Sequence, residues 1–352
     1  MLDLAVGWLV LLFLVGAAAT WVAGIALSRT TDALDVRFNL GDALGGIVIL
    51  ALAGTLPEFA ITVSAAAQGD LSLAAGNLIG GIAVQTMVLV ICDTAVRGDR
   101  PLTFLVGALT PVLEALLVVL VVSVVLMGAL LPQSAAIGGV VSPASLVIVL
   151  FWLGGIAVVN WVRKNPRWSV SMPGSHRGRA SKREKHPEAV HPYAGSTTTR
   201  VLVYFAAAAA VTLIAGVALE LSGEALADRA GINGVVFGAT VLATATALPE
   251  ISSGLAAVKL GDNALAIGDI FGGNAFQVCL FLVADLIAGS PVLPTAGHLN
   301  SWLASLGVAL TAVYGTGLIV RPERRIARLG LDSIVAIVVF AGGIVGLTLL
   351  PT

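Results

Sequence analysis

The sequence is poor in charged residues. Lys and Arg together number 19 and Asp and Glu 20, so that charged residues make up 11% of the 352 residues, where a soluble domain has about 25%. Apolar residues make up 58%, and apolar runs of about 18–25 residues recur along the whole chain. This composition excludes an ordinary soluble domain and indicates that lipid surrounds most of the chain. The net charge of −1 gives no reason to expect a nucleic-acid partner.

Cysteine and histidine are also scarce. The two cysteines, Cys92 and Cys279, lie in apolar runs, which excludes a disulfide framework and favours a packing role. Three of the four histidines, His176, His186 and His191, lie in the polar segment 163–200. They have no tight ligand spacing, so a solvated loop is favoured over metal binding or pH sensing.

The apolar runs predict an all-α polytopic membrane protein with about ten transmembrane helices. The predicted spans are 4–28, 44–67, 71–95, 102–130, 140–162, 201–227, 234–258, 263–288, 298–320 and 331–350. The first run could instead be a signal peptide. However, only Asp3 precedes it and the first basic residue, Arg29, follows it, which favours a helix.

The basic residues predict the orientation. If successive loops alternate sides, 18 of the 19 Lys and Arg residues fall on one side, nine of them in 163–200, and only Arg229 falls on the other. The positive-inside rule makes the basic side cytoplasmic, with both termini outside the cytoplasm and the protein in the plasma (inner) membrane. The basic linker is also expected to contact anionic lipid.

A shift of 192 residues aligns the two halves without a gap. The predicted domains are a first five-helix repeat (1–162), a cytoplasmic linker (163–200) and a second five-helix repeat (201–352). The matches are Gly46/Gly238, Ala51/Ala243, Leu56/Leu248, Pro57/Pro249, Glu58/Glu250, Gly69/Gly261, Asp70/Asp262, Gly76/Gly268, Gly80/Gly272, Gly81/Gly273, Ala83/Ala275, Gln85/Gln277 and Asp93/Asp285. Because each half has an odd number of spans, the sequence predicts two inverted repeats, which are typical of secondary transporters.

Each repeat carries Leu-Pro-Glu within its second span, ending at Glu58 and Glu250. A proline frees a carbonyl about four residues earlier, here near Ala53 and Ala245. Such carbonyls and a mid-membrane carboxylate need protein, water or a ligand to satisfy them. Two matched glutamates therefore predict a shared cation site. A kink with a protonated glutamate is the alternative.

The third predicted span of each half carries two stripes, which are rows of residues spaced four apart, so that each stripe lies on one face of a helix. Gly76/Gly80 and Gly268/Gly272 predict close helix packing. Beside them lie Asn77, Gly81 and Gln85, matched by Asp269, Gly273 and Gln277. The glutamines are expected to line the cavity as hard-cation ligands, with backbone capping as the alternative, and Asn77 and Asp269 to surround the site. Thr55 and Thr246 offer hydroxyls or bond to their own helices. Glu114 has no polar match and receives no role.

At these motifs the chain resembles the cation/calcium exchanger superfamily, of the sodium/calcium exchanger type. The resemblance rests on Ala53–Glu58 and Ala245–Glu250, together with Gly76–Ile82 and Gly268–Asn274. The motifs lie in paired alpha-repeats, here about 44–95 and 234–288. The resemblance implies two inverted five-helix halves, ion-binding glutamates at Glu58 and Glu250, and carbonyl ligands at Ala51 and Ala243.

Several side-chain oxygens of the family pattern are missing. Gly54, Gly81, Ala247 and Gly273 stand where relatives have hydroxyl or other polar side chains, and Gln85 and Gln277 stand where they have Asn or Asp. The expected ligands are Glu58, Glu250, Gln85, Gln277, Thr55, Thr246, Ala51 and Ala243, surrounded by Asn77, Asp269, Gly81 and Gly273. The coupling ion, Na⁺ or H⁺, stays open at this point.

The sequence thus predicts a transporter, without cofactor, that exchanges Ca²⁺ or a related cation for Na⁺ or H⁺ by alternating access. A cation channel, or a monovalent-cation antiporter (Na⁺/H⁺ or K⁺/H⁺), is the alternative, although an inverted repeat with broken helices favours alternating access. An intramembrane hydrolase is disfavoured, because no nucleophile and base are paired in the spans.

Overall fold

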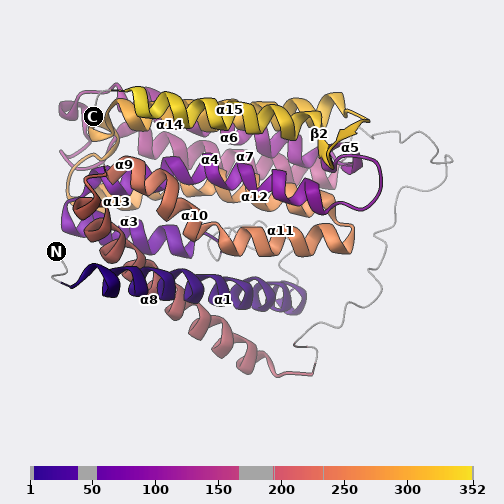
Figure 1. Cartoon of the computed structure of the whole chain (residues 1–352), viewed down its shortest axis with the longest axis horizontal. Coiled ribbons are helices and arrows are strands. Elements are labelled where there is room, and N and C mark those ends of the chain that lie inside the picture. Colours follow the sequence, from indigo (N-terminus) through magenta and orange to yellow (C-terminus); the bar gives the residue numbers. More distant parts are fainter. Residues whose placement is uncertain (1–3, 39–53, 166–192, 194, 233, 351–352) are drawn as a thin grey trace.

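The computed structural model describes residues 4–38, 54–165, 193, 195–232 and 234–350, and most of them are helical (Figure 1). The elements of the first half are α1 (Val6–Phe38), α3 (Leu56–Gln68), α4 (Leu71–Ala95), α5 (Leu102–Leu105), α6 (Thr110–Ala129), η2 (Gln133–Ala135) and α7 (Pro143–Lys164). Those of the second half are α8 (Thr198–Ala230), α9 (Gly234–Phe237), η3 (Gly238–Leu242), α10 (Ala243–Thr246), α11 (Leu248–Leu260), α12 (Asn263–Gln277), α13 (Leu280–Ala288), η4 (Leu293–Thr295), α14 (Gly297–Val320), β1 (Arg325–Ile326), β2 (Leu329–Gly330) and α15 (Leu331–Leu349).

The helices are long and apolar enough to cross a membrane. Seven pass this test among the described residues, and the bent pair Val235–Thr246 and Leu248–Leu260 adds an eighth if the pair is one span. Leu331–Leu347 is a shorter apolar helix. The prediction of an all-α polytopic membrane protein is confirmed. The count of ten stays a prediction, because part of the expected span 44–67 lies outside the described residues.

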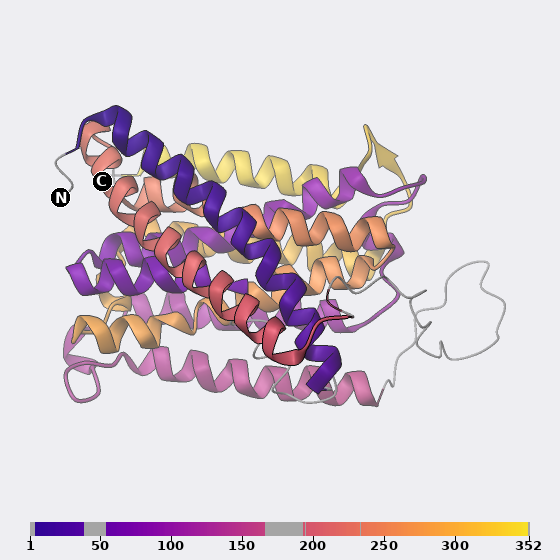
Figure 2. The ribbon, with the colours of Figure 1, turned by 90° about the horizontal axis from the view of Figure 1, so that it is seen from below.

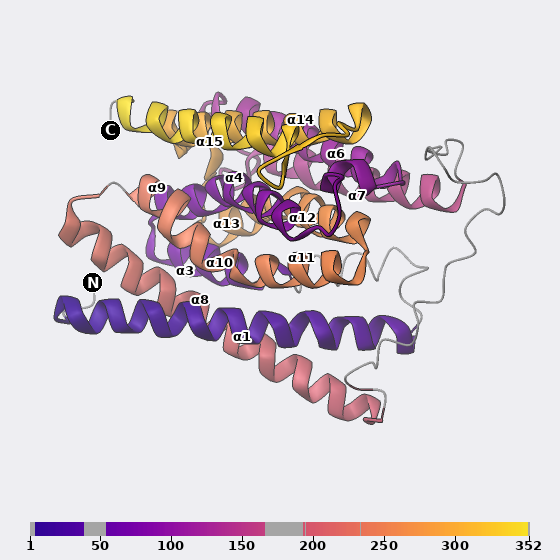
Figure 3. The same ribbon diagram turned by 45° about the vertical axis from the view of Figure 1, so that its right-hand side comes forward.

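Several predicted boundaries need correction. The expected span 102–130 is divided: α5 ends at Leu105 and α6 begins at Thr110, because Pro111 occupies the first turn of α6, where its missing N–H costs nothing. The first helices of the two halves, α1 and α8, each have 33 residues and extend beyond the predicted 4–28 and 201–227. At 1.5 Å per residue each is about 50 Å long, and the two pack against each other obliquely (Figures 2 and 3).

Matched glycine and aspartate residues form equivalent turns in the two halves. Gly69 ends α3 and Gly261 ends α11, both with left-handed backbone (φ 81° and 83°) that glycine adopts without strain. The next residue caps the following helix: the Asp70 carboxylate accepts a hydrogen bond from the Leu73 N–H (2.9 Å), and Asp262 accepts one from Leu265 (3.0 Å). Two of the repeat matches therefore have a structural explanation.

A second matched pair, Asp93 and Asp285, joins the halves. The buried Asp93 carboxylate accepts hydrogen bonds from the N–H groups of Leu102 and Gly330 and from the Ser333 hydroxyl at the start of α15. The Asp285 carboxylate correspondingly accepts them from the Val292 N–H and, at the start of α7, from the Ser142 N–H and the Ser145 hydroxyl. Each carboxylate thus holds the N-terminus of the last helix of the opposite half, where negative charge is favoured.

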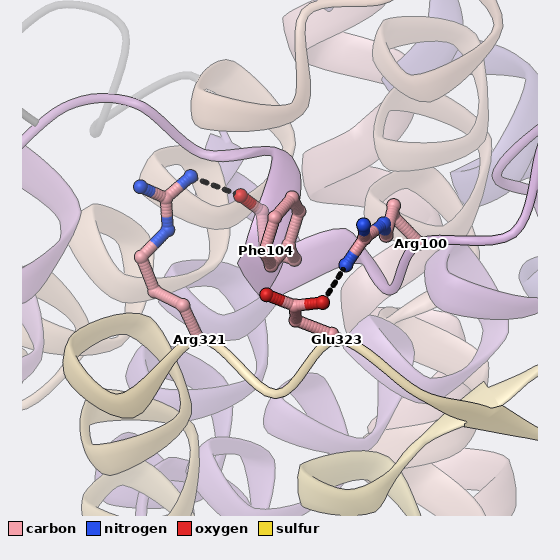
Figure 4. Close-up of polar contacts among 4 residues, drawn as sticks. All are labelled: Arg100, Phe104, Arg321 and Glu323. Carbon is pink, nitrogen blue, oxygen red and sulfur yellow. Dashed lines mark hydrogen bonds and ion pairs between the residues drawn. The ribbon is translucent and has the colours of Figure 1, made fainter. Parts of the chain in front are cut away.

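A polar cluster fastens α5 to the segment after α14. Arg100 forms an ion pair with Glu323 (2.5 Å), and both Arg100 and Arg321 lie over the ring of Phe104 (Figure 4). Arg321 also donates a hydrogen bond to the Phe104 carbonyl. Because the Arg100 and Glu323 side chains are well exposed, their ion pair contributes little stability. The cluster serves mainly to fix the position of α5.

Candidate cation site

The helix that carries Glu250 is broken next to it. Helix α10 ends at Thr246, α11 begins at Leu248 with Pro249 in its first turn, and the two parts are bent by 45°. A five-residue π-helical segment, η3, precedes the break. In the first half Thr55 precedes α3, which begins at Leu56 with Pro57 in its first turn. The expected freed carbonyl near Ala53 lies outside the described residues.

A cavity of about 540 Å³ is lined mainly by α1, α6, α7, α11 and α12, with residues of α3, α4 and α8. Its lining includes Thr110 at the start of α6, Arg163 near the end of α7 and Ala264 at the start of α12. We call the end of the bundle where α7 ends and α8 begins the linker side, and the end where α1 begins the far side (Figure 1). The cavity extends from the linker side inward to Glu250 and Gln85.

Glu58 lies behind the inner end of this cavity. Its carboxylate is fully buried, and its Oε1 atom accepts a hydrogen bond from the Gln85 amide (3.0 Å). Among the described residues, its Oε2 atom has no hydrogen-bond partner. Gln85 and Thr55 line the cavity, and the Thr246 side chain lies next to the Glu58 carboxylate. The structure thus brings Glu58, Gln85 and Thr55 together near the inner end of the cavity, and their roles as ligands stay predictions.

Glu250 lines the cavity directly, and its Oε2 atom is also buried without a partner. It interacts electrostatically with Glu58 and with Asp269. Asp269 lines the same cavity and accepts a hydrogen bond from the Ser253 hydroxyl (2.8 Å). Two glutamates and an aspartate thus share a poorly hydrated region, which is unfavourable unless protons or a cation neutralise them.

Three other expected ligands, Gln277, Thr246 and Ala243, are not among the residues that line the cavity. The Gln277 amide donates to the Leu78 carbonyl (2.8 Å), which is the backbone-capping alternative. The Ala243 carbonyl already accepts hydrogen bonds from the Ala247 N–H and the Thr246 hydroxyl, so Thr246 bonds to its own helix. Ala51 lies outside the described residues. Their roles as ligands stay predictions.

The matched stripes of the third helices differ in their surroundings. Gly76 and Gly80 pack tightly against Val235 and Ala239, as expected for a packing stripe, but Gly272 and Gly273 line the cavity. The space beside Gly81 is taken by the Gln277 amide, which lies 2.3 Å from where a Cβ would be. Asn77 is fully buried and is not among the cavity-lining residues. The two halves therefore differ locally although their motifs match.

Two features of this region were not predicted. Glu114, which received no role, lines the cavity. On the far side, the buried Glu220 carboxylate of α8 accepts hydrogen bonds from Ser64 (2.8 Å) and Gln68 (2.9 Å) of α3. No sequence pattern indicates these contacts. The residue 192 positions before Glu220 is Ser28 rather than an acid, and Glu220 lies some 150 residues from Ser64 and Gln68. These bonds hold α3 against α8 on the side away from the cavity mouth.

Comparison with known proteins identifies the family. The family model described as sodium/calcium exchanger protein matches residues 8–161 and 200–351. The chain therefore belongs to the sodium/calcium exchanger protein family, a family of transporters rather than of enzymes. CaxA of Alkalimonas amylolytica is 25% identical over 260 residues, 74% of each chain. The inner membrane protein YrbG of Escherichia coli K12 is 24% identical over 267 residues, 75% of this chain and 73% of YrbG.

Solved structures share the fold. The crystal structure of an H⁺/Ca²⁺ exchanger, CAX, has a TM-score of 0.69 at 17% identity, covering 98% of this chain and 82% of that one. The sodium-calcium exchanger NCX_Mj has a TM-score of 0.59 at 16% identity, covering 99% of this chain and all of that one. These likenesses establish a multi-pass exchanger fold, while the ions depend on the site itself.

Proposed function

We propose that this protein is an antiporter that exchanges Ca²⁺ for a second cation at a site held by Glu58 and Glu250. The observation that carries the proposal is the pair of carboxylates in the first turns of α3 and α11, each with one buried oxygen that has no hydrogen-bond partner among the described residues. Together they supply two negative charges, which one Ca²⁺ or two protons would neutralise. Gln85 and Thr55, beside them, offer oxygen ligands of the kind Ca²⁺ prefers.

We further propose H⁺ as the coupling ion. Positions next to the two glutamates lack side-chain oxygens that flanking Na⁺ sites would use: Gly54 and Gly273 carry none, and the Gln277 amide donates to the Leu78 carbonyl. Protons need only the two carboxylates. The fold likenesses include both an H⁺/Ca²⁺ and a sodium-calcium exchanger, so they do not favour either ion.

The position of the cavity supports exchange by alternating access. The cavity reaches Glu250 from the linker side, while the Glu220 contacts hold α3 and α8 together on the far side. A site accessible from one side at a time is what an exchanger requires. We propose that the linker side is cytoplasmic, as its basic residues indicate, and that both termini are extracytoplasmic.

Proteoliposomes test this proposal. Ca²⁺ uptake is measured with a pH gradient in Na⁺-free buffer and, separately, with a Na⁺ gradient at equal pH on both sides. We expect uptake with the pH gradient, accompanied by proton movement in the opposite direction. Uptake that occurs only with Na⁺ and without proton flux would show that Na⁺ is the coupling ion. No Ca²⁺ uptake with either gradient would contradict Ca²⁺ antiport.

A further inference from the structure

Glu114 is the membrane carboxylate that the matched repeats leave without explanation. It lies in α6, and the position 192 residues later is the apolar Leu306. In the structure Glu114 lines the same cavity as Glu250 and Asp269. Thr110 and Pro111, at the start of α6, also line the cavity and precede Glu114 on the same helix. Glu114 therefore belongs to the passage between the linker side and the central carboxylates.

The surroundings of Glu114 leave its carboxylate unsatisfied. Its Oε2 atom is buried and has no hydrogen-bond partner among the residues that the structure describes. This oxygen points at Gly268 of α12: a Cβ built on Gly268 would lie 3.0 Å from it. A glycine at this position gives the carboxylate room against the α12 backbone. A buried charged oxygen without a partner is costly, so either a proton or a bound cation is expected to satisfy it.

Asp269, the residue after Gly268, connects this region with the central site. It interacts electrostatically with Glu114 on one side and with Glu250 on the other. The matched residue in the first half is Asn77, which is neutral and does not line the cavity. Of this matched pair, the member that lines the cavity is therefore the one that carries a negative charge. Arg163, which also lines the cavity, interacts with Glu114.

We propose that Glu114 and Asp269 form a second cation-binding position between Glu250 and the linker-side mouth of the cavity. At this position the two carboxylates and water molecules would bind a divalent cation. The Ser253 hydroxyl donates a hydrogen bond to Asp269 and fixes the position of that carboxylate. Two protein carboxylates and one nearby arginine predict weaker binding than at Glu58 and Glu250, as suits a position through which the transported ion passes. This inference rests on the proposed Ca²⁺ antiport, because it specifies the route to that site.

Terbium luminescence tests the proposal without transport. Trp152 lines the same cavity, so excitation of its indole is expected to sensitise Tb³⁺, a Ca²⁺ substitute, bound near Glu114. The full chain is used in detergent with Glu58→Gln, which disables the central site. We expect a Tb³⁺ signal that Ca²⁺ reverses. Adding Glu114→Gln or Asp269→Asn should weaken Tb³⁺ binding by about tenfold or more, whereas adding Glu224→Gln, a carboxylate of α8 that does not line the cavity, should not.

The possible results separate this inference from the proposed function. An unchanged Tb³⁺ affinity on adding Glu114→Gln, or no Tb³⁺ signal from Glu58→Gln with its helical circular dichroism intact, would overturn the second position. Glu114→Asp, which keeps the charge, covers the case in which Glu114→Gln fails to fold, and should retain measurable binding. If Glu114→Gln alters only the pH dependence of uptake, the position takes a proton and the cation proposal is wrong. Ca²⁺ antiport itself is judged separately, by uptake into proteoliposomes containing the unmodified protein.

Discussion

At the scale of single residues, the two matched glutamines have different surroundings and should respond differently to mutation. Gln85 donates to Glu58, whereas Gln277 donates to the Leu78 carbonyl. We expect Gln85→Leu to raise the Ca²⁺ concentration for half-maximal exchange by about tenfold, because Glu58 loses its donor. We expect Gln277→Leu to lower the free energy of unfolding by about 1–3 kcal/mol, because the Leu78 carbonyl is left buried and unsatisfied.

Ca²⁺-dependent uptake and thermal unfolding of both variants check this prediction. A change in the Ca²⁺ dependence of Gln277→Leu as large as that of Gln85→Leu would place Gln277 among the cation ligands, as its sequence position first suggested. A stability loss in Gln277→Leu with an unchanged Ca²⁺ dependence would establish backbone capping.

The candidate site could be predicted from sequence only as far as its symmetry extends. Glu58 and Glu250 were found because proline and glutamate recur in register, and a mid-membrane carboxylate is unusual. The role of Gln277 could not be found this way, because its partner is a backbone carbonyl, which a sequence pattern does not reveal. Glu114 has no match in the other half, so its place beside Gly268 emerges only when α6 and α12 are packed together.

At the scale of the elements, Asp93 and Asp285 are expected to be essential for stability. Each carboxylate accepts three hydrogen bonds from buried groups. We expect Asp93→Ala and Asp285→Ala each to lower the free energy of unfolding by about 3 kcal/mol, because three donors lose their acceptor. Thermal unfolding in detergent measures this loss, with Asp99→Ala, at an exposed loop position, as the control. Stability equal to that of the control would show that water replaces the carboxylate.

A matched glycine pair determines how the two long helices meet the breaks. A Cβ on Gly24 of α1 would lie 2.5 Å from Pro249 side-chain atoms, and one on Gly216 of α8 would lie 3.1 Å from the Pro57 carbonyl oxygen. The two glycines are 192 residues apart, so each helix packs on the break of the opposite half. This pair could have been found in the sequence, but a glycine among 40 glycines gives a weak signal.

We expect Gly24→Leu and Gly216→Leu to reduce Ca²⁺ exchange at least about tenfold, because the added side chain pushes α1 or α8 away from the prolines. Gly7→Leu is the control, since no atom lies within 4 Å of a Cβ at that position. Uptake is compared at equal amounts of folded protein. Exchange by Gly24→Leu at the rate of Gly7→Leu would show that this contact is not needed for transport.

At the scale of the whole molecule, the sequence predicted the membrane class but not the paths of individual helices. Apolar runs define spans because the bilayer selects length and composition. They do not define where a span is interrupted, so α5 and α6 were predicted as one helix. The extra length of α1 and α8 was missed for a related reason: their ends continue as helix beyond the apolar run.

The cavity predicts which side of the membrane gives access to the site. Cys92 and Cys279 are buried, so the unmodified chain should react slowly with a membrane-impermeant maleimide. We expect Thr110→Cys, in the cavity lining, to react rapidly when the reagent is on the linker side. We expect Ser64→Cys, at the position that contacts Glu220, to be protected from reagent on either side. Inverted and right-side-out vesicles provide the two sides. Labelling of Ser64→Cys but not of Thr110→Cys would place the opening on the far side.

The central claim, that Glu58 and Glu250 hold the exchanged cation, is tested most directly by replacing each with its amide. Ca²⁺ uptake driven by a pH gradient is measured in proteoliposomes containing equal amounts of unmodified protein, Glu58→Gln, Glu250→Gln or the control Glu224→Gln. Glutamine keeps the size and hydrogen-bonding capacity of the side chain but removes the charge. We predict that both Glu58→Gln and Glu250→Gln fold, as judged by thermal unfolding, and lose exchange, while Glu224→Gln exchanges normally. Exchange at the unmodified rate by either Glu58→Gln or Glu250→Gln would contradict the account.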